Sequence, residues 1–252
     1  MLKTGYNQHN IPQLILLFCL TLILAACTSE ATPPDDAALT PTPTPRELSA
    51  AIGRATLASQ SVGFELTLSG YPVALDSAGL MLLNRMQGDL QRPDGVLALL
   101  QVTVGATAVS ELRTVSFEGR QYLTNPLTRQ WVCVDPDLSF DPAILFAPDQ
   151  GIEYLLQEGF DQVELVGYEQ LAGREHYHLR GVMDAEQLQS ISLGLLGRAQ
   201  VSVELWADRE SLQLTQLVLV DGPPETDEAT TWTLMFRDYG KHVDVRAPIV
   251  CE

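Results

Sequence analysis

The stretch "VLALLQVTV", residues 96–104, has the alternation of a β-strand that buries one of its two faces. The first alternating set is wholly apolar: Val96, Ala98, Leu100, Val102 and Val104. The second set mixes apolar and polar residues: Leu97, Leu99, Gln101 and Thr103. Because successive side chains of a strand point to opposite faces, we expect the first set to face the interior. A shift of one residue in the strand pairing would reverse this assignment.

Strands of the same kind are predicted on both sides of this stretch. Residues 62–68 alternate in the same way, with an apolar face made of Val62, Phe64, Leu66 and Leu68. Further strands are predicted over residues 79–91, 108–117, 120–124, 163–171, 175–181, 201–207, 212–220, 230–238 and 242–246. Short turn sequences such as "EGR" (118–120) separate them. Because few long helical crossovers lie between these strands, an antiparallel meander is expected.

Three helices complete the predicted fold. The first helix is predicted over residues 45–59. Thr44 and Glu47 have the spacing of a capping box, and Pro45 stands at the first helical position. A short helix is predicted over residues 149–158, and another over residues 184–197. The apolar stripe of this last helix consists of Leu188, Ile191 and Leu195. The fold class is therefore α+β, with an antiparallel sheet of about ten strands, long enough to curl on itself.

Six segments of the sequence, taken in their order and spacing, resemble one known family. They are "GDLQRPD" (88–94), "YLTNPLTRQW" (122–131), "GIEYLL" (151–156), "GREHYHLRG" (173–181), "VELWAD" (203–208) and "DYGKHVDVRAPI" (238–249). In this arrangement the chain resembles the LppX/LprA/LprF/LprG lipoprotein family, which is related to the LolA-like carriers. The resemblance implies a curved antiparallel half-barrel, with helices over its concave side and an acyl-chain cavity between them. It also implies that the protein binds lipids or lipoglycans and carries them through the cell envelope.

The ligand-binding residues are then expected on the apolar faces of the strands and on the covering helix. They are Phe64, Leu66, Leu68, Val96, Ala98, Leu100, Val102, Leu188, Ile191 and Leu195. If the cavity exists, Ala98→Trp is expected to fill it, to leave the melting temperature near that of the parent and to reduce lipid uptake. The alternative is an ordinary packed core, in which the same fold acts as a non-enzymatic interaction or sensor module of the envelope.

The N-terminal residues have the pattern of an export signal. Residues 14–26 are apolar except for Thr21, and they are too few to span a bilayer core, which needs about 20 residues. The following "LAAC" (24–27) resembles a bacterial lipobox, which implies cleavage before Cys27 and attachment of lipid to that residue. Ordinary secretion or an uncleaved anchor are the alternatives. We therefore expect the protein on the extracytoplasmic face of the bacterial cell membrane, held there through Cys27.

Three regions follow from this division. Residues 1–26 are expected to be the signal peptide, residues 27–45 the lipidated cysteine with a Thr/Pro-rich linker, and residues 46–252 a single lipid-binding domain. The linker ends in three Thr-Pro pairs, a composition that forms an extended spacer and not a packed core.

The charge of the chain excludes one class of partner. It contains 32 acidic residues and 15 Lys and Arg residues, so its formal net charge is −17. A surface this acidic repels the phosphate backbone, and we therefore expect no nucleic-acid partner. A monomer without a cofactor is expected.

Two cysteines remain for the mature domain, because Cys19 lies in the signal peptide and Cys27 is the lipid-attachment site. An exported location permits a disulfide between Cys133 and Cys251. Such a bond would close a loop of more than a hundred residues, which contributes about 4 kcal/mol if its effect comes from chain entropy. Two separate buried thiols are the alternative.

No catalytic arrangement is evident in the sequence, so a non-enzymatic protein is expected, and a hydrolase with an unrecognised site is the weaker alternative. Nucleophile elbows, H-E-x-x-H zinc motifs and phosphate-binding glycine loops are all missing. His176 and His178 share one face of a strand but lack an evident third metal ligand, and we interpret them as solvent-facing. Asp135, Asp137 and Asp141 lack the order of a calcium-binding loop, and we expect a solvated acidic loop there.

Overall fold

The computed structural model describes the larger part of the chain: residues 42–75, 78–105, 107–134, 141–183, 186, 188–189, 195–196, 200–223 and 228–251. Residues 43–252 form one compact unit with its own hydrophobic core. The expected signal peptide, Cys27, most of the linker, Ile191 and two of the three loop aspartates, Asp135 and Asp137, lie outside the described residues. So does most of the helix expected over 184–197, of which Glu186, Leu188 and Gln189 are described and helical. Among the described residues, no helix combines the length and apolar character needed to span a membrane.

In the part of the chain that the structure describes, a twelve-stranded antiparallel sheet forms the body of the protein. Its strands are β1 (Ser61–Gly70), β2 (Val73–Ala74), β3 (Met81–Gln91), β4 (Gly95–Val104), β5 (Ala108–Phe117), β6 (Arg120–Thr124), β7 (Trp131–Val134), β8 (Phe160–Leu171), β9 (Arg174–Met183), β10 (Val201–Asp208), β11 (Leu214–Asp221) and β12 (Thr230–Arg237). Apart from the partly described helix at residues 186–189, the helices of the described residues are α1 (Pro45–Leu57), the 3₁₀ helix η2 (Pro142–Phe146) and α2 (Ile152–Glu158). The prediction of a curved α+β half-barrel is confirmed, with two more strands than expected.

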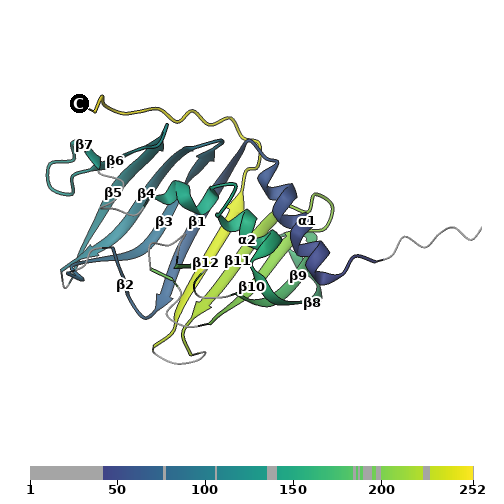
Figure 1. The fold of residues 1–252 in the computed structure, drawn as a ribbon. Coiled ribbons are helices and arrows are strands. Elements are labelled where there is room, and N and C mark those ends of the chain that lie inside the picture. Colours follow the sequence, from purple (N-terminus) through teal and green to yellow (C-terminus); the bar gives the residue numbers. More distant parts are fainter. Residues whose placement is uncertain are drawn as a thin grey trace, which may run out of the picture. The chain divides into compact units, whose positions relative to one another are not determined.

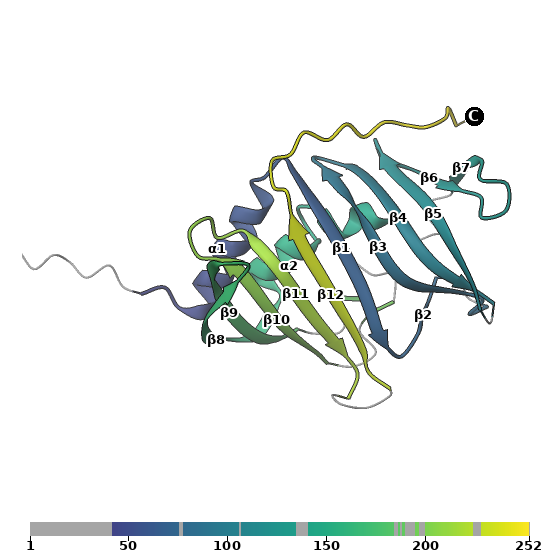
Figure 2. The same ribbon diagram turned by 180° about the vertical axis from the view of Figure 1, so that it is seen from behind.

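The strand order places the N-terminal strand of the sheet beside its C-terminal strand. Neighbours in the sheet are β7-β6-β5-β4-β3-β1-β12-β11-β10-β9-β8, and β2 pairs with β3. The first and last long strands, β1 and β12, therefore lie side by side at the centre, with Leu66 opposite Leu234. Helices α1 and α2 lie in front of the sheet in Figure 1 and behind it in Figure 2, so both cover the same, concave face.

The register of β4 agrees with the expected inward face. Val96, Ala98, Leu100 and Val102 are all buried, at 0–5% exposure. The exception is Val104, which is 38% exposed because it ends the strand beside a surface turn. The alternation of polar and apolar residues thus correctly assigned the two faces of this strand.

Helix α1 begins as its sequence predicts and ends against α2. The side chain of Thr44 accepts a hydrogen bond from the Glu47 backbone, and the Glu47 carboxylate accepts one from the Thr44 backbone, as in a capping box. Near its middle, Gly53 permits close approach, because a Cβ there would lie 2.6 Å from the carbonyl oxygen of Glu153 in α2. Ser49 adds a 2.6 Å hydrogen bond to the carbonyl oxygen of Leu156. The two helices therefore form one tightly joined cover.

The C-terminal segment corrects one predicted strand. Residues 242–246 are extended but pair with no strand, because both edges of the nearby β3 are already occupied by β1 and β4. The apolar Val245 instead packs on the convex face against Val115 and Tyr122. Figures 1 and 2 both show this segment running past the ends of β1, β3 and β4 toward β6 and β7.

The predicted disulfide between Cys133 and Cys251 is confirmed. It joins β7 to the end of the C-terminal segment across 118 residues, with the two Cα atoms 5.9 Å apart. The bond fixes the last described residues against one edge of the sheet.

The two edge strands differ from the strands inside the sheet. At one edge, β7 has only four residues, and it was not predicted because four residues show too little alternation. At the other edge, the register of β8 with β9 shifts twice, between Phe160 and Gln162 and between Leu165 and Gly167. Such irregularities interrupt the row of backbone groups that a regular strand presents.

Candidate ligand-binding site

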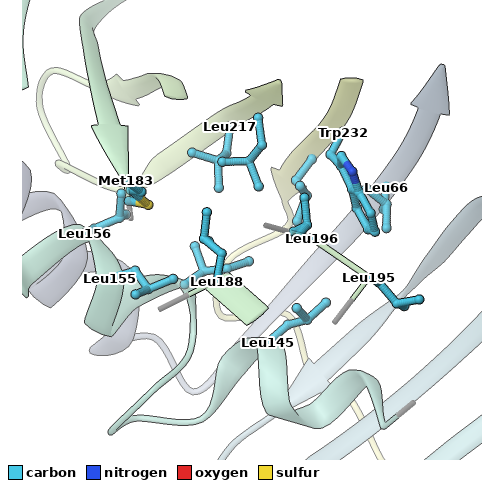
Figure 3. Close-up of a pocket in the computed structure, with 13 residues that line it drawn as sticks. Leu66, Leu145, Leu155, Leu156, Met183, Leu188, Leu195, Leu196, Leu217 and Trp232 are labelled. Atoms are coloured by element: carbon cyan, nitrogen blue, oxygen red, sulfur yellow. The ribbon is translucent and has the colours of Figure 1, made fainter. Parts of the chain in front are cut away.

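A pocket lies between the concave face of the sheet and its helical cover. Its lining is apolar throughout and comes from both layers: Leu66, Leu145, Ile152, Leu155, Leu156, Met183, Leu188, Leu195, Leu196, Leu217, Leu219, Trp232 and Leu234. Figure 3 shows the labelled side chains converging on one space, with Leu188 near its centre. The free volume is only about 30 Å³, room for no more than a few water molecules.

The sheet side of the pocket follows from strand alternation on neighbouring strands. Leu217 and Leu219 of β11 lie beside Leu234 and Trp232 of β12, with which they pair directly. Leu66 of β1 is the partner of Leu234 on the other side. These inward positions form a continuous leucine-rich floor across three adjacent strands, all of it 1–5% exposed.

The cover side of the pocket comes from η2 and α2. Helix α2 places Ile152, Leu155 and Leu156 on its buried face, a spacing of three and four residues that follows the helical repeat. Leu145 of η2 adds a fourth apolar side chain. Asp141 fixes the start of η2 by accepting a hydrogen bond of 2.9 Å from the backbone N–H of Ala143. This role is structural, as an N-cap.

The buried ion pair Arg92–Glu153 ties the cover to the sheet. Arg92 follows β3, and its side chain is 8% exposed, whereas that of Glu153 in α2 is 1% exposed. The guanidinium donates to the Glu153 carboxylate at 2.5 Å, to the carbonyl oxygen of Ser59 at 3.0 Å and to that of Phe146 at 3.1 Å. One side chain therefore links the ends of α1, β3 and η2 to α2.

Burial dominates the electrostatics of this link. The pKa of Glu153 is raised from its ordinary value because burial disfavours the charged carboxylate, and the Arg92 charge opposes this only in part. Nearby, burial also raises the pKa of Tyr239 well above its usual range. The Tyr239 hydroxyl donates to the carbonyl oxygen of Leu214 at 2.5 Å, where it fixes the start of β11.

The geometry is an apolar space between a half-barrel and its helices, and the comparisons with known proteins agree with it. The LppX_LprAFG lipoprotein family matches residues 44–245. The chain belongs to this family. No curated protein sequence matches the chain.

Two solved structures share the fold of these LppX_LprAFG lipoproteins. LprF from Mycobacterium bovis superposes with a TM-score of 0.62 at 16% identity, over 82% of this chain and 99% of its own. Mycobacterium tuberculosis lipoprotein LppX superposes with a TM-score of 0.54 at 15% identity, over 79% of this chain and 98% of its own. At such low identity the superpositions establish the shared fold alone.

The structure brings together only part of the ligand set expected for a family member. Leu66, Leu188 and Leu195 line the pocket. The other described members lie outside it. Leu68 is partly buried against the core, and the rest are core residues: Phe64, Val96, Ala98, Leu100 and Val102. Phe64 packs against Phe146 of η2 in a tilted arrangement, with ring centroids 4.9 Å apart. Leu100 lines a second small cavity, of about 60 Å³, over β3 to β6.

Sequence reasoning missed the pocket residues of β11, β12 and α2. All of them lie in elements that were predicted, and each has the apolar spacing that marks an inward face. The local sequence does not show which of the many inward-facing residues lie beneath the helices. Their position depends on the pairing of β1 with β12, which are far apart in the chain. The site is therefore displaced from β4 toward the other half of the sheet.

The interpretation of His176 and His178 as solvent-facing is wrong. Both do lie on the convex face, but they are only 1% and 5% exposed, because long neighbouring side chains cover them. The His178 ring stacks on Trp206 at 4.4 Å between centroids, with its ring nitrogens 2.7 Å from Glu169 and 3.1 Å from Glu204. The described residues contain no group of three or more His, Cys, Asp or Glu suited to a metal ion.

Proposed function

We propose that the protein is an extracytoplasmic lipoprotein, anchored through Cys27, that binds acyl chains in the leucine-lined pocket and carries them through the envelope. The observation that supports this most is the lining of the pocket. Thirteen apolar side chains from two layers, the sheet and its helical cover, surround it. Family membership supports the same function, since the family consists of lipoproteins.

The proposed binding needs no covalent chemistry. Each buried methylene of a lipid chain contributes about 0.8 kcal/mol, so a chain with many methylenes leaves a bilayer very slowly without help. A protein pocket that replaces the bilayer contacts lowers this barrier. The acidic surface of the protein favours ligands whose headgroups carry little negative charge.

An acyl chain enters such a pocket only if the two layers separate. A space of about 30 Å³ is far too small for an acyl chain, so α2 and η2 have to move outward from β11 and β12. The movement is opposed by the Arg92 link, which ties both helices to the sheet.

The small volume also supports the second candidate function. If the layers do not separate, the leucines form an ordinary packed core, and the protein acts through its outer surfaces as a non-enzymatic envelope module.

Three variants of residues 43–252 distinguish the two functions by uptake of a fluorescent fatty acid. Leu217→Trp is expected to fill the pocket and abolish most of the uptake, and Leu217→Ala to enlarge it and maintain uptake. Leu90→Ala is the matched control, because Leu90 is equally buried but lies outside the pocket. Both alanine variants are expected to lose about 2–5 kcal/mol of stability. Uptake that is absent from the parent, together with an absence of lipid in organic extracts of the purified protein, would contradict the carrier.

The anchor is tested separately in a lipoprotein-processing bacterium. Cys27→Ala is expected to abolish incorporation of labelled fatty acid into the full-length chain. Label retained by the variant would show that Cys27 is not the acylated residue.

A further inference from the structure

Two hollows open on the convex face of the sheet, opposite the leucine-lined pocket. The larger, of about 380 Å³, extends from Arg237 of β12 and Lys241 across β3 and β4 to β5. The smaller, of about 250 Å³, extends from β4 and β5 to Thr124 of β6 and Trp131 of β7. Both are lined by Leu99, Glu111 and Arg113. They therefore form one groove across the strands, which we call the convex groove.

The groove lies on the face that the sheet turns away from its core. Its lining includes Leu97 and Leu99, the alternate positions to the buried Val96, Ala98 and Leu100 of β4. Leu97 is 39% exposed, and Leu99 and Trp131 are half-buried. The floor thus exposes apolar side chains to solvent in a part of the sheet that no helix covers.

Four cations line this apolar floor: Arg113, Arg129, Arg237 and Lys241. Only two acidic residues, Asp89 and Glu111, line it with them. In a chain whose net charge is −17, this is a local excess of positive charge. Such an excess attracts an anionic partner at short range.

The cations at the ends of the groove are already engaged, whereas the central one is free. Lys241 lies 3.5 Å from the Asp89 carboxylate, and Arg129 donates to the backbone carbonyl oxygen of Glu111 at 2.7 Å. Arg237 lies 3.7 Å from Glu65. The exposed guanidinium of Arg113 contacts no acceptor among the described residues. It lies where the two hollows meet, and its planar donors fit a carboxylate in a bidentate manner.

We propose that the convex groove binds an extended acidic segment of a partner protein, with a partner carboxylate on Arg113 and partner apolar side chains on Leu97, Leu99 and Trp131. The part of the groove from β3 to β7, which holds Leu97, Leu99 and Trp131, crosses four inter-strand spacings, about 19 Å, the length of about six extended residues. A flat membrane surface does not reach the floor of a hollow, and a single lipid headgroup fills only one of the two. The inference is independent of lipid binding in the pocket.

Selection of displayed random heptapeptides on residues 43–252 tests the proposal. Peptides that alternate Asp or Glu with apolar residues are expected to be enriched. Measured by fluorescence anisotropy, their affinity is expected to fall at least about tenfold in Arg113→Ala and to weaken with added salt. Arg180→Ala is the matched control, because Arg180 is an exposed convex-face arginine of β9 outside the groove, and it is expected to leave the affinity unchanged.

Three results would overturn the inference. The first is a selection that enriches no acidic peptides, and the second is enriched peptides that bind Arg113→Ala as tightly as the parent. The third is binding to phosphatidylglycerol vesicles that depends on Arg113 while peptide binding does not, which would assign the groove to a lipid surface.

Discussion

The two halves of the sheet differ in charge and in the number of their layers. Residues 141–221, which form η2, α2 and β8 to β11, contain fourteen acidic and four basic residues, whereas residues 81–134, β3 to β7, contain four acidic residues and five arginines. The acidic half has the apolar pocket under its cover. In the other half, η2 packs on the concave face of β4, and the C-terminal segment packs on the convex face beside the convex groove. One continuous sheet therefore carries the covered pocket in one half and a packed wall in the other.

The largest expected effect lies in the packed half, at its disulfide. Cys133→Ser removes a cross-link over 118 residues and is expected to lower the free energy of unfolding of residues 43–252 by up to about 5 kcal/mol. Urea denaturation measures the loss. Hydrogen exchange is expected to accelerate in β5 to β7 and to change little in β8 to β11. Equal acceleration in both halves would show that they do not differ in this way.

Arg92 joins the two halves, and its replacement is expected to be nearly as costly. Arg92→Met leaves the Glu153 carboxylate buried without its cation, so we expect a loss of about 3–5 kcal/mol in urea denaturation. Arg85→Met is the control, because the Arg85–Glu65 pair lies partly exposed at the surface and contributes at most about 1 kcal/mol. Similar losses in the two variants would contradict the role of Arg92 as a buried link.

A smaller effect is expected from a tryptophan substitution in the packed wall, which is compared with the same substitution in the pocket. Ala98 is 3% exposed, and a Cβ on Gly88 of the neighbouring strand would lie 2.9 Å from the Ala98 Cβ, so the two strands approach closely at this buried position. Ala98→Trp is therefore expected to cost about 1–3 kcal/mol through overpacking and not to block lipid uptake specifically, unlike Leu217→Trp. This replaces the sequence-based expectation. Thermal melting and fatty-acid uptake of the two variants, compared side by side, measure the difference. A stable Ala98→Trp variant that has lost uptake would restore that earlier expectation.

The smallest effect concerns acid stability in the acidic half. Burial of Asp208 acts to raise its pKa, but hydrogen bonds from Ser211 and Glu210 and the charge of Arg174 outweigh it, and the pKa is lowered. Because the pKa of Asp208 is lower in the folded protein than in the unfolded chain, the charged carboxylate stabilises the fold at pH values above the unfolded pKa of about 3.8. This stabilisation is lost as the pH falls through the pKa of the folded protein. Asp208→Asn is expected to lose about 1 kcal/mol at neutral pH and less below about pH 4. A loss that stays constant between pH 7 and pH 3 would contradict this assignment.

Sequence alone predicted the features that depend on neighbouring residues. The buried face of β4, the Thr44 cap of α1 and the order of the meander all follow from local alternation and capping rules. The pocket does not, because Leu217 and Trp232 become its floor only through the pairing of β1 with β12. His178 shows the same limit, because its burial depends on Trp206 of the neighbouring strand.

The open edges of the sheet bear on how the protein behaves when crowded. Attachment to a membrane would concentrate the domains in two dimensions, where one unpaired strand meets another often. A long regular edge then templates polymerisation. Here the edge strand β7 has only four residues and carries the disulfide to Cys251, and the other edge strand, β8, is interrupted twice by register shifts. These edges oppose strand-to-strand growth and favour the monomer that we expect, so a dense layer of such domains would remain a population of separate molecules.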